Sequence, residues 1–538
     1  MLQTPKSYNG MVVAPHHLAS QAGLAVLREG GSAIEAMVAA ASTIAVVYPH
    51  MNGLGGDNFW LIRTPDGKVN GIDACGAAAG LADIDWYKNQ AHQQIPDRGP
   101  LAAVTVAGAV SGWQRALELG TSLPGKRIPL QRLLADAIGH AKNGVAVTAT
   151  LADNAAGKRD QLQAQPGFAD VYLPGGKPVA EGTKLLQERI ASSLEQLVSA
   201  GLDDYYRGDL AASISADLQA IGSPLRREDL ERHRALDVDP LVLKIREHSL
   251  YNMPPPTQGL ASLLLLGVFD RLQQQGVAPS VDSFDYVHAL VESTKASFKI
   301  RDRYVTDPQY MEQAANSFLT DDVLQELVAS VDLKKAAPWP QATGAGDTVW
   351  LGAIDKNGCA VSFIQSVFWE FGSGCILPQS GITWQNRGTS FSLDAAHHNC
   401  LKPLRRPFHT IQPAMAELGD GRVMPYGTMG GEGQPQTQAM VFSRYVHYGQ
   451  SLQQSVTAPR WLLGKTWGSE KTNLRIEQRF APEVYQQLLA AGHDVEQVGE
   501  FEEFMGHAGA LALHTKGDRA GVIEGAADPR SDGSVAAC

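Results

Sequence analysis

The stretch GAGDTVWLGAIDKNGCAVSFIQS, residues 344–366, decides the fold of this chain. It contains two runs rich in apolar and β-branched residues, 348–354 and 359–364, joined by Asp-Lys-Asn-Gly. An Asn-Gly pair between two such runs is a strong signal for a β-hairpin. The residues before the hairpin, 334–346, include Pro-Trp-Pro and Gly-Ala-Gly, which neither a helix nor a central strand tolerates. The stretch therefore predicts an exposed linker followed by a hairpin whose first strand begins at Thr348.

The position of Thr348 permits nucleophilic chemistry. A threonine hydroxyl is a weak nucleophile at neutral pH and needs a base within hydrogen-bonding distance. Cleavage between Asp347 and Thr348 would create an α-amino group with a pKa of ~7.7–8.0, near the pH at which a general base works best. The Thr348 hydroxyl could make that cut by attacking the Asp347 carbonyl and forming an ester, which water would release as two chains. The alternative is that Thr348 is only a β-forming residue after a turn, and its position alone favours that interpretation.

A glycine cluster, YGTMGGEG at residues 426–433, is the second feature with chemical potential. The unhindered backbone amides of Gly430 and Gly431 could donate to a developing oxyanion. A tight turn is the alternative, because clusters of glycine form turns far more often. The cluster is not a phosphate-binding Walker loop, because Gly-Lys-Ser/Thr is missing.

The composition is that of a globular enzyme, since 44% of the 538 residues are hydrophobic and 19% are charged. The formal charge of −11 argues against nucleic-acid binding, which usually requires a basic face, and favours a small-molecule partner. No apolar run is long enough to span a bilayer or to form a signal peptide, so we expect a cytoplasmic protein without a membrane partner. Five cysteines without a CxxC pair favour free thiols, and we expect neither metal nor cofactor.

Apolar periodicity and capping residues predict the elements around the hairpin. Ser32 follows Gly30 and Gly31 and is expected to cap a helix over residues 33–47. Asp282 is expected to cap a charged helix that continues to Tyr304. The other expected elements are a helix over 18–29, a strand over 59–63, mainly helices over 112–235, a strand near 241–245 and a helix over 260–275.

Segments along nearly the whole chain, taken in order, resemble the gamma-glutamyltransferase family. They are MVVA at 11–14, LASQAG at 18–23, GGSAIEA at 30–36, GLGG at 53–56, MPPP at 253–256, RDRY at 301–304, DP at 307–308, GDT at 346–348, FGSG at 371–374, RP at 406–407, GG at 430–431 and DPR at 528–530. So many ordered matches exclude chance agreement. The resemblance implies an α+β fold, the four-layer αββα sandwich of the N-terminal nucleophile hydrolases.

The resemblance also implies how the chain matures. It implies a large chain, 1–347, and a small chain, 348–538, that form one compact body as a heterodimer after self-cleavage; further dimerisation stays open. Thr348 matches the family nucleophile, and Ser366 matches the hydroxyl residue that assists it eighteen positions later. The glycine pair at 430–431 matches the family's oxyanion hole.

The substrate-recognition positions depart from the family pattern. Cys75 stands where the family has an arginine that clamps the α-carboxylate of a glutamyl substrate, and a thiol cannot replace a bidentate guanidinium. Phe368 and Ser390 stand where the family has an asparagine and an acidic ligand for the substrate amine. His409 and Thr410 replace its paired serines. The site for the substrate amine is therefore lost.

Arg387 stands where the family usually has an uncharged or amide side chain, so the pocket gains a cation. Phe368, with Trp350 or Trp369, would narrow it. A small carboxylate-bearing amide suits such a pocket, and within the family the chain is similar to the oxamate amidohydrolases of purine and urate breakdown, which release oxalate and ammonia. Arg387 could instead be an ordinary surface residue, and His409 a core histidine with satisfied hydrogen bonds.

The sequence thus predicts a self-cleaving threonine amidohydrolase that acts on a small amide. Two other functions stay open. One is a gamma-glutamyl hydrolase or transferase, or an acylase of larger amides, and the missing arginine argues against the glutamyl version. The other is a non-enzymatic homologue that never matures, against which the presence of the matched nucleophile, helper hydroxyl and glycine pair argues.

Overall fold

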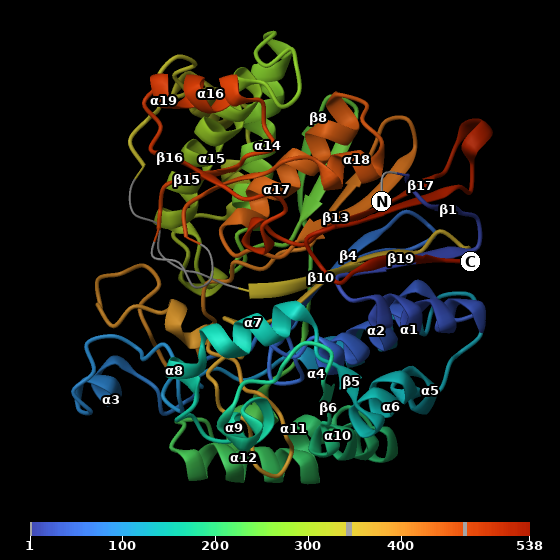
Figure 1. Cartoon of the computed structure of the whole chain (residues 1–538), viewed down its shortest axis with the longest axis vertical. Coiled ribbons are helices and arrows are strands. Elements are labelled where there is room, and N and C mark those ends of the chain that lie inside the picture. Colours follow the sequence, from blue (N-terminus) through green and yellow to red (C-terminus); the bar gives the residue numbers. More distant parts are fainter. Residues whose placement is uncertain (1–2, 340–346, 466–470) are drawn as a thin grey trace.

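The computed structural model of the chain describes residues 3–339, 347–465 and 471–538. Two seven-stranded antiparallel sheets lie face to face at its centre, and helices cover the outer face of each (Figure 1). This is the four-layer αββα sandwich that the sequence predicts, so the expected fold class is confirmed. Residues 340–346 of the expected linker lie outside the described residues.

The predicted hairpin forms the centre of the first sheet. β10 (Asp347–Asp355) and β11 (Ala360–Phe368) pair antiparallel, with Ile354 opposite Ala360. β10 begins at Asp347, one residue earlier than predicted. Across the sheet the order is β19 (Ser534–Ala537), β2 (Gly10–Ala14), β10, β11, β3 (Asp57–Arg63), β4 (Val69–Asp73) and β7 (Leu236–Val238).

The second sheet presents the glycine cluster at one end of its central strand. Its order is β1 (Lys6–Ser7), β18 (Ile523–Ala527), β17 (Ala508–His514), β13 (Arg422–Thr428), β12 (Ala414–Glu417), β9 (His248–Asn252) and β8 (Leu241–Ile245). β13 ends at Thr428, and one residue, Met429, separates it from the glycine pair. The face-to-face sheets therefore present the start of β10 and the end of β13 to a common region.

The two sheets pack against each other through an apolar layer that includes Trp350. A Cβ atom at Gly427 or Gly509 of the second sheet would lie 2.2 or 2.4 Å from the Trp350 ring, so both positions require glycine. The Trp350 indole N–H donates to Ser362 Oγ at 2.9 Å. Trp350 therefore belongs to the core between the sheets, and the prediction that it narrows the substrate pocket is wrong.

Helix α2 (Ala33–Val47) packs on the first sheet, and every one of its residues is buried. Ser32 caps it as predicted, because its hydroxyl accepts from the Glu35 N–H while Glu35 Oε2 accepts from the Ser32 N–H at 2.8 Å. The chain before β7 also forms α1 (His17–Arg28), α3 (Ile84–Lys88), α4 (Ala109–Gly120), α5 (Leu130–Leu133), α6 (Ala135–Asn143), β5 (Val145–Ala146), α7 (Ala149–Gly157), α8 (Arg159–Leu162), α9 (Phe168–Tyr172), β6 (Lys184–Leu185), α10 (Glu188–Ala200), α11 (Asp204–Arg207), α12 (Asp209–Ile221) and α13 (Arg227–Arg232).

The other helical layer contains α15 (Phe284–Tyr304), which begins after Ser283; the Ser283 hydroxyl accepts from the Tyr286 N–H. The prediction that Asp282 caps this helix is wrong, because its carboxylate instead binds the Arg444 guanidinium at 2.6 Å. This part of the chain also forms α14 (Gly259–Gln274), α16 (Asp321–Ala329), α17 (Gly433–Phe442), α18 (Leu452–Thr457), β14 (Trp461–Leu463), β15 (Leu474–Glu477), α19 (Pro482–Ala490) and β16 (Val495–Val498).

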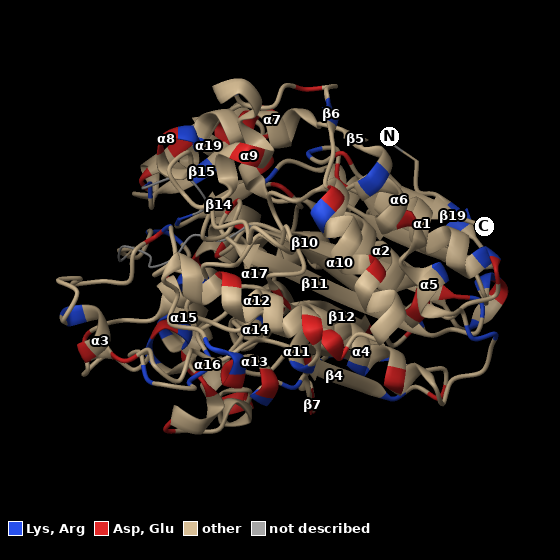
Figure 2. Cartoon of the chain, turned by 90° about the horizontal axis from the view of Figure 1, so that it is seen from below, with Lys and Arg blue, Asp and Glu red and all other residues tan. Residues whose placement is uncertain are grey.

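Charged side chains of both signs lie on the outer helices and loops, whereas the labelled central strands β10 and β11 are largely uncharged (Figure 2). All five cysteines, each within the described residues, are free thiols, and four are buried. Among the described helices, none has the length and apolar character needed to cross a bilayer. Because charged side chains lie mainly on the outside, the polar side chains that are buried inside the sandwich mark the candidate functional site.

Candidate active site

Thr348 lies in an irregularity of the central hairpin. Asp347 pairs with Phe368 and Val349 pairs with Gln365, so Thr348 faces the two residues that begin with Ser366. Bulges of this kind bend a strand and re-aim a side chain, and they are common beside active sites. The hairpin thus places both predicted hydroxyl residues opposite each other, a feature that the sequence did not reveal.

The side chains of Thr348 and Ser366 are fully buried. Thr348 Oγ1 accepts a hydrogen bond from Gln434 Nε2 at 3.4 Å. Ser366 Oγ accepts from the Phe368 N–H at 2.8 Å, where Phe368 has the left-handed φ of 82°. Gln434 is held in turn, since its Oε1 accepts from the Gln412 N–H at 3.1 Å. The sequence analysis missed Gln434. The one signal that could have indicated it is its position in the first turn of the helix that follows the glycine pair.

Gly430 and Gly431 form the turn between β13 and α17. Their φ values of 117° and 53° explain why glycine stands at both positions. Their carbonyl groups accept from the N–H groups of Gly433 at 2.8 Å and Gln434 at 3.3 Å. Within the described part of the chain, neither N–H group donates to a partner. Both amides are therefore available to stabilise negative charge near Thr348.

A buried polar network holds this turn in place. Gln258 Nε2 donates to the carbonyl groups of Gly431 at 2.8 Å and Thr410 at 2.6 Å. Arg301 donates through Nη1 to Gln258 Oε1 at 3.1 Å and through Nη2 to Glu432 Oε1 at 2.9 Å. Burial raises the pKa of Glu432 to about 7, although Arg301 opposes this shift. Gln258 thus ties the glycine turn to the predicted substrate-binding segment, and only the fold reveals that link.

Arg387 is buried, with 1% of its surface exposed, so it is not an ordinary surface residue. Its guanidinium carbon lies 3.9 Å from the centre of the Phe368 ring, and Nη1 makes a long hydrogen bond of 3.4 Å to Thr410 Oγ1. Nε and Nη2 have no hydrogen-bond partner among the described residues. Burial lowers the pKa of Arg387 to about 9, while Asp57 and then Cys75 oppose the shift. A buried guanidinium with unsatisfied donors is costly, and an anion would satisfy it.

His409 lies beside Arg387 in the same polar region and is buried, but its hydrogen bonds are not satisfied. Neither ring nitrogen has a hydrogen-bond partner in the described structure, and Nε2 lies 3.7 Å from Asp57 Oδ2. Burial, reinforced by the charges of Arg387 and Arg406, holds the pKa of His409 well below its usual value. His409 is therefore neutral near pH 7.

Asp57, at the start of β3, was not predicted as a site residue. Its Oδ1 accepts from the N–H groups of Gly76 and Gly108, both at 3.0 Å. Burial raises the pKa of Asp57 to about 7, against the lowering effects of the Gly108 N–H and Arg387. The sequence carried one signal, an acidic residue two positions before the apolar run 59–62 of this strand.

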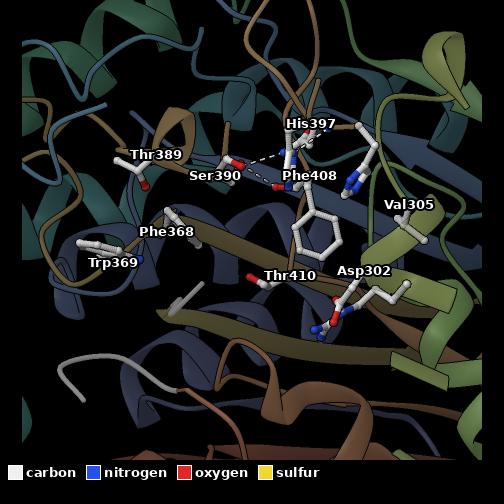
Figure 3. Close-up of a pocket in the computed structure, with 12 residues that line it drawn as sticks. Asp302, Val305, Phe368, Trp369, Thr389, Ser390, His397, Phe408 and Thr410 are labelled. Atoms are coloured by element: carbon white, nitrogen blue, oxygen red, sulfur yellow. Dashed lines mark hydrogen bonds and ion pairs between the residues drawn. The ribbon is translucent and has the colours of Figure 1, made fainter. Parts of the chain in front are cut away.

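A cavity of about 140 Å³ opens beside these groups, and Figure 3 shows Phe368, Ser390, Phe408 and Thr410 around it. Trp369, one of the two tryptophans that the sequence offered as residues narrowing the pocket, also lines this cavity. The lining residues are Arg301, Asp302, Val305, Phe368, Trp369, Thr389, Ser390, His397, His398, Asn399, Phe408 and Thr410. The Ser390 hydroxyl is used internally, since it donates to the carbonyl groups of Arg387 and Phe408.

The structure separates Cys75 from this cavity. Cys75 lines a different cavity of about 210 Å³ together with Arg406. Arg406 is paired there with Asp73 at 2.7 Å and Asp307 at 3.4 Å. Arg405 is also engaged by protein groups, including the Cys400 carbonyl at 2.8 Å. Arg387, by contrast, contacts the cavity-lining residues Phe368 and Thr410 and keeps two nitrogens, Nε and Nη2, without a partner among the described residues.

One group of described residues, His288, Glu292 and His493, holds three potential metal-ligand atoms within 4.8 Å of one another. Their bonds are already made: Glu292 binds the Lys295 ammonium at 2.7 Å, and His288 bonds His493 and the Asp332 carbonyl, both at 2.8 Å. A cation would have to compete with Lys295. We therefore assign no metal to this group.

A buried threonine at the start of a central strand of an αββα sandwich, with a glycine turn presented by the facing sheet, defines the N-terminal nucleophile hydrolase class. Residues 19–538 match the gamma-glutamyltranspeptidase family, and the chain belongs to that family. The family and the enzyme class predicted from the sequence, an amidohydrolase, are confirmed.

The chain is 52% identical to an oxamate amidohydrolase proenzyme of Klebsiella pneumoniae, over 98% of both chains. It is 39% identical to a glutathione hydrolase-like proenzyme of Bacillus subtilis, again over 98% of both chains. Among solved structures, a cephalosporin acylase from Bacillus halodurans matches with a TM-score of 0.90 and 32% identity, over 100% of this chain and 97% of that one. These relatives share the fold but differ in the substrates that their names state.

Proposed function

We propose that this protein is a self-cleaving amidohydrolase that converts oxamate to oxalate and ammonia. The observation that carries the proposal is the buried Arg387 guanidinium, whose unsatisfied N–H groups suit a small carboxylate. The similarity to an oxamate amidohydrolase proenzyme supports the same substrate. The family holds a gamma-glutamyl substrate with an arginine and an asparagine, which Cys75 and Phe368 replace here. Cys75 lies in a separate cavity and Phe368 stacks on Arg387, so neither side chain suits a gamma-glutamyl substrate.

Maturation begins with the Thr348 hydroxyl. Oγ1 attacks the Asp347 carbonyl carbon, the peptide C–N bond breaks, and an ester joins the two residues. Water then hydrolyses the ester, which leaves a carboxylate on Asp347 and a free α-amino group on Thr348. The products are the proposed chains 1–347 and 348–538. The irregular pairing at this end of β10 supports the reaction, because the extra residue of β11 opposite Thr348 interrupts the regular ladder beside the bond to be cut.

Turnover uses the same oxygen with the new amine as base. The amine takes the proton of Oγ1, which attacks the amide carbon of oxamate, and the amide nitrogen leaves as ammonia with a proton. Water hydrolyses the resulting oxalyl ester to oxalate and restores Thr348. The Gly430 and Gly431 N–H groups stabilise the oxyanion, and Ser366 orients the nucleophile. Arg387 and Thr410 bind the substrate carboxylate, next to His409 and Phe368.

The substrate test uses the purified protein. We expect two bands on a denaturing gel, corresponding to residues 1–347 and 348–538, and ammonia release from oxamate but not hydrolysis of a gamma-glutamyl anilide. Larger acyl amides included in the same panel test the acylase alternative. Preference for the anilide or a larger amide would reject oxamate as substrate, and a persistent single full-length band without activity would favour the non-enzymatic alternative.

Gly430→Ala tests the oxyanion turn. A φ of 117° strains any side chain, although the nearest atom to a Cβ atom would be 3.6 Å away, so the substitution shifts the amides without a clash. Removing one oxyanion donor costs about 10²–10³ in turnover, and we expect displacement to lower kcat about 10- to 100-fold. Gly222→Ala is the control, because Gly222 has a φ of 97°, open space around it and a position at the end of α12. Equal kcat values for both variants would remove Gly430 from the mechanism.

A further inference from the structure

Three buried side chains with unsatisfied polar atoms converge on the proposed carboxylate site. Arg387 has two such nitrogens, His409 has both ring nitrogens, and Asp57 has Oδ2, each without a hydrogen-bond partner among the described residues. They come from three separate parts of the chain: Arg387 begins the short 3-10 helix Arg387–Ser390, His409 precedes β12, and Asp57 begins β3. Arg387 and Asp57 affect each other's charge, yet in the described structure their unsatisfied atoms do not pair. A third polar group could therefore bind between the unpaired atoms of Arg387 and Asp57.

The orientation of Asp57 is fixed by the backbone. Because Oδ1 accepts from two N–H groups, at Gly76 and Gly108, the carboxyl cannot turn away from the site without losing both bonds. Oδ2 is the oxygen that faces His409. The carboxyl therefore keeps one oxygen directed at the polar region whatever its protonation state.

Few other groups near Asp57 carry a charge. His409 is neutral, because burial lowers its pKa, and burial raises the pKa of the Cys75 thiol well above its usual value. The Tyr205 and Tyr206 hydroxyls, whose pKa values burial also raises, donate to the backbone carbonyls of Leu54 and Ala107. The Gln385 amide is the remaining polar neighbour of Asp57 and cannot ionise. Arg406, whose charge also acts on His409, is paired with Asp73 and Asp307. Among the described residues, the charge of the pocket therefore changes mainly with Asp57, opposite Arg387.

We propose that Asp57 is a specificity-determining residue that takes up one proton when the substrate carboxylate binds Arg387, so that the pocket binds a carboxylate and a proton together. The identity of the substrate rests on the proposed function, whereas the coupling between anion and proton does not. An ionised Asp57 would face the incoming carboxylate with a like charge. A protonated Asp57 instead donates its O–H to that carboxylate while Arg387 donates N–H groups. The proton comes from solvent and returns when the product leaves.

The direction of the pH effect follows from burial of Asp57, which raises its pKa to about 7 in the free protein. Binding of an anion raises that pKa further, because the charged form of Asp57 is then opposed by a second negative charge. Below the free-protein value, Asp57 is already protonated and KM for oxamate is lowest. Above it, a proton must be taken up with each substrate, so KM rises about tenfold for each pH unit.

The test compares mature wild-type protein with Asp57→Asn. Asparagine keeps the Oδ1 acceptor for Gly76 and Gly108 but cannot ionise. We expect the variant to lose the pH dependence of KM between pH 6 and 8, below the pKa of about 9 at which Arg387 itself loses its charge, and to have a KM at pH 8 about tenfold below that of the wild type. The change should appear in KM rather than in kcat, which a general loss of structure would not produce.

Asp355→Asn is the matched control. Asp355 is also a buried carboxyl with a raised pKa and accepts backbone N–H groups, including that of Ala33 at 2.9 Å, but it lies at the opposite end of β10 from Thr348. We expect this variant to keep the wild-type dependence of KM on pH. Loss of the dependence in the control as well would assign it to another group and overturn the proposal.

Calorimetric binding of oxalate separates the proposal from the substrate assignment, because it needs no turnover. In buffers with different ionisation enthalpies, oxalate should bind wild-type protein with uptake of about one proton at about pH 8, where Arg387 is still charged, and Asp57→Asn with about one proton less. If oxamate is not hydrolysed but oxalate binds with a proton, the substrate is wrong and the coupling stands. Oxalate binding without proton uptake, or no oxalate binding to wild-type protein, overturns the coupling.

Discussion

Thr348→Ala is expected to leave the chain uncut and to reduce amide hydrolysis to background, a fall of roughly 10⁴-fold or more. Both losses have one cause, because the same oxygen attacks the Asp347 carbonyl during maturation and the substrate amide during turnover. Alanine fits the space of the buried threonine and removes the Oγ1 contact with Gln434, so the fold should survive. The measurements are the band pattern on a denaturing gel over time and ammonia release from oxamate.

Two comparisons make this prediction specific. Thr348→Ser keeps a hydroxyl on the same carbon and should retain part of both reactions. Thr294→Ala removes another fully buried threonine hydroxyl, one that bonds the Leu290 carbonyl within α15, and should mature normally. Cleavage at the Asp347-Thr348 bond in the Thr348→Ala variant would require another nucleophile or a separate protease, and the proposed mechanism would fail.

Arg387→Lys is expected to raise KM for oxamate about 100-fold while self-cleavage continues. A lysine keeps the charge but cannot present two parallel N–H groups to a carboxylate, and each hydrogen bond to a charged group contributes about 1.5–3 kcal/mol. The stacking of the guanidinium on Phe368, at 3.9 Å, would be lost as well. Maturation should be spared because the Asp347 carbonyl needs no carboxylate clamp. Steady-state kinetics on oxamate and the gel assay measure the two effects separately.

Arg405→Lys is the matched comparison for Arg387→Lys. Both arginines are buried, but the Arg405 guanidinium bonds protein groups, among them the Thr306 hydroxyl at 2.8 Å. The Arg405 variant should lower the melting temperature without changing KM by a similar factor. If the two variants gave the same KM, or if Arg387→Lys had wild-type kinetics, Arg387 would not be the carboxylate ligand, and His409 would be the next candidate.

Local sequence signals determined much of the scaffold. The Asn-Gly pair predicted the β10–β11 hairpin, because a tight turn of that type joins adjacent antiparallel strands. Ser32 and Glu35 predicted the start of α2, since the two side chains satisfy the N–H groups of the first turn. The cap of α15 was misplaced by one residue: Asp282 and Ser283 are both good cap residues, and the distant Arg444 binds the aspartate.

The surroundings of the Thr348 and Trp350 side chains could be assigned only from the position of the second sheet. Thr348 and Trp350 are two residues apart, so strand alternation directs both toward the facing sheet, yet the sequence could not tell the edge of the site from the core. The facing glycines, Gly427 and Gly509, leave room for the Trp350 ring and draw it into the interior. Thr348, at the end of the strand, instead meets Gln434.

By itself the sequence determined the hairpin, the position of the proposed nucleophile within it and the substitutions at the family's substrate-recognition positions, because each depends on neighbouring residues or on motif order. Tertiary structure alone decided which polar groups meet. Asp57 and Arg387 are 330 positions apart in the sequence. No local sequence pattern predicts that both side chains are buried in the same region with unsatisfied polar atoms. Their charge states follow from desolvation, which depends on how many protein atoms surround each group in three dimensions rather than on the residues beside it in the chain.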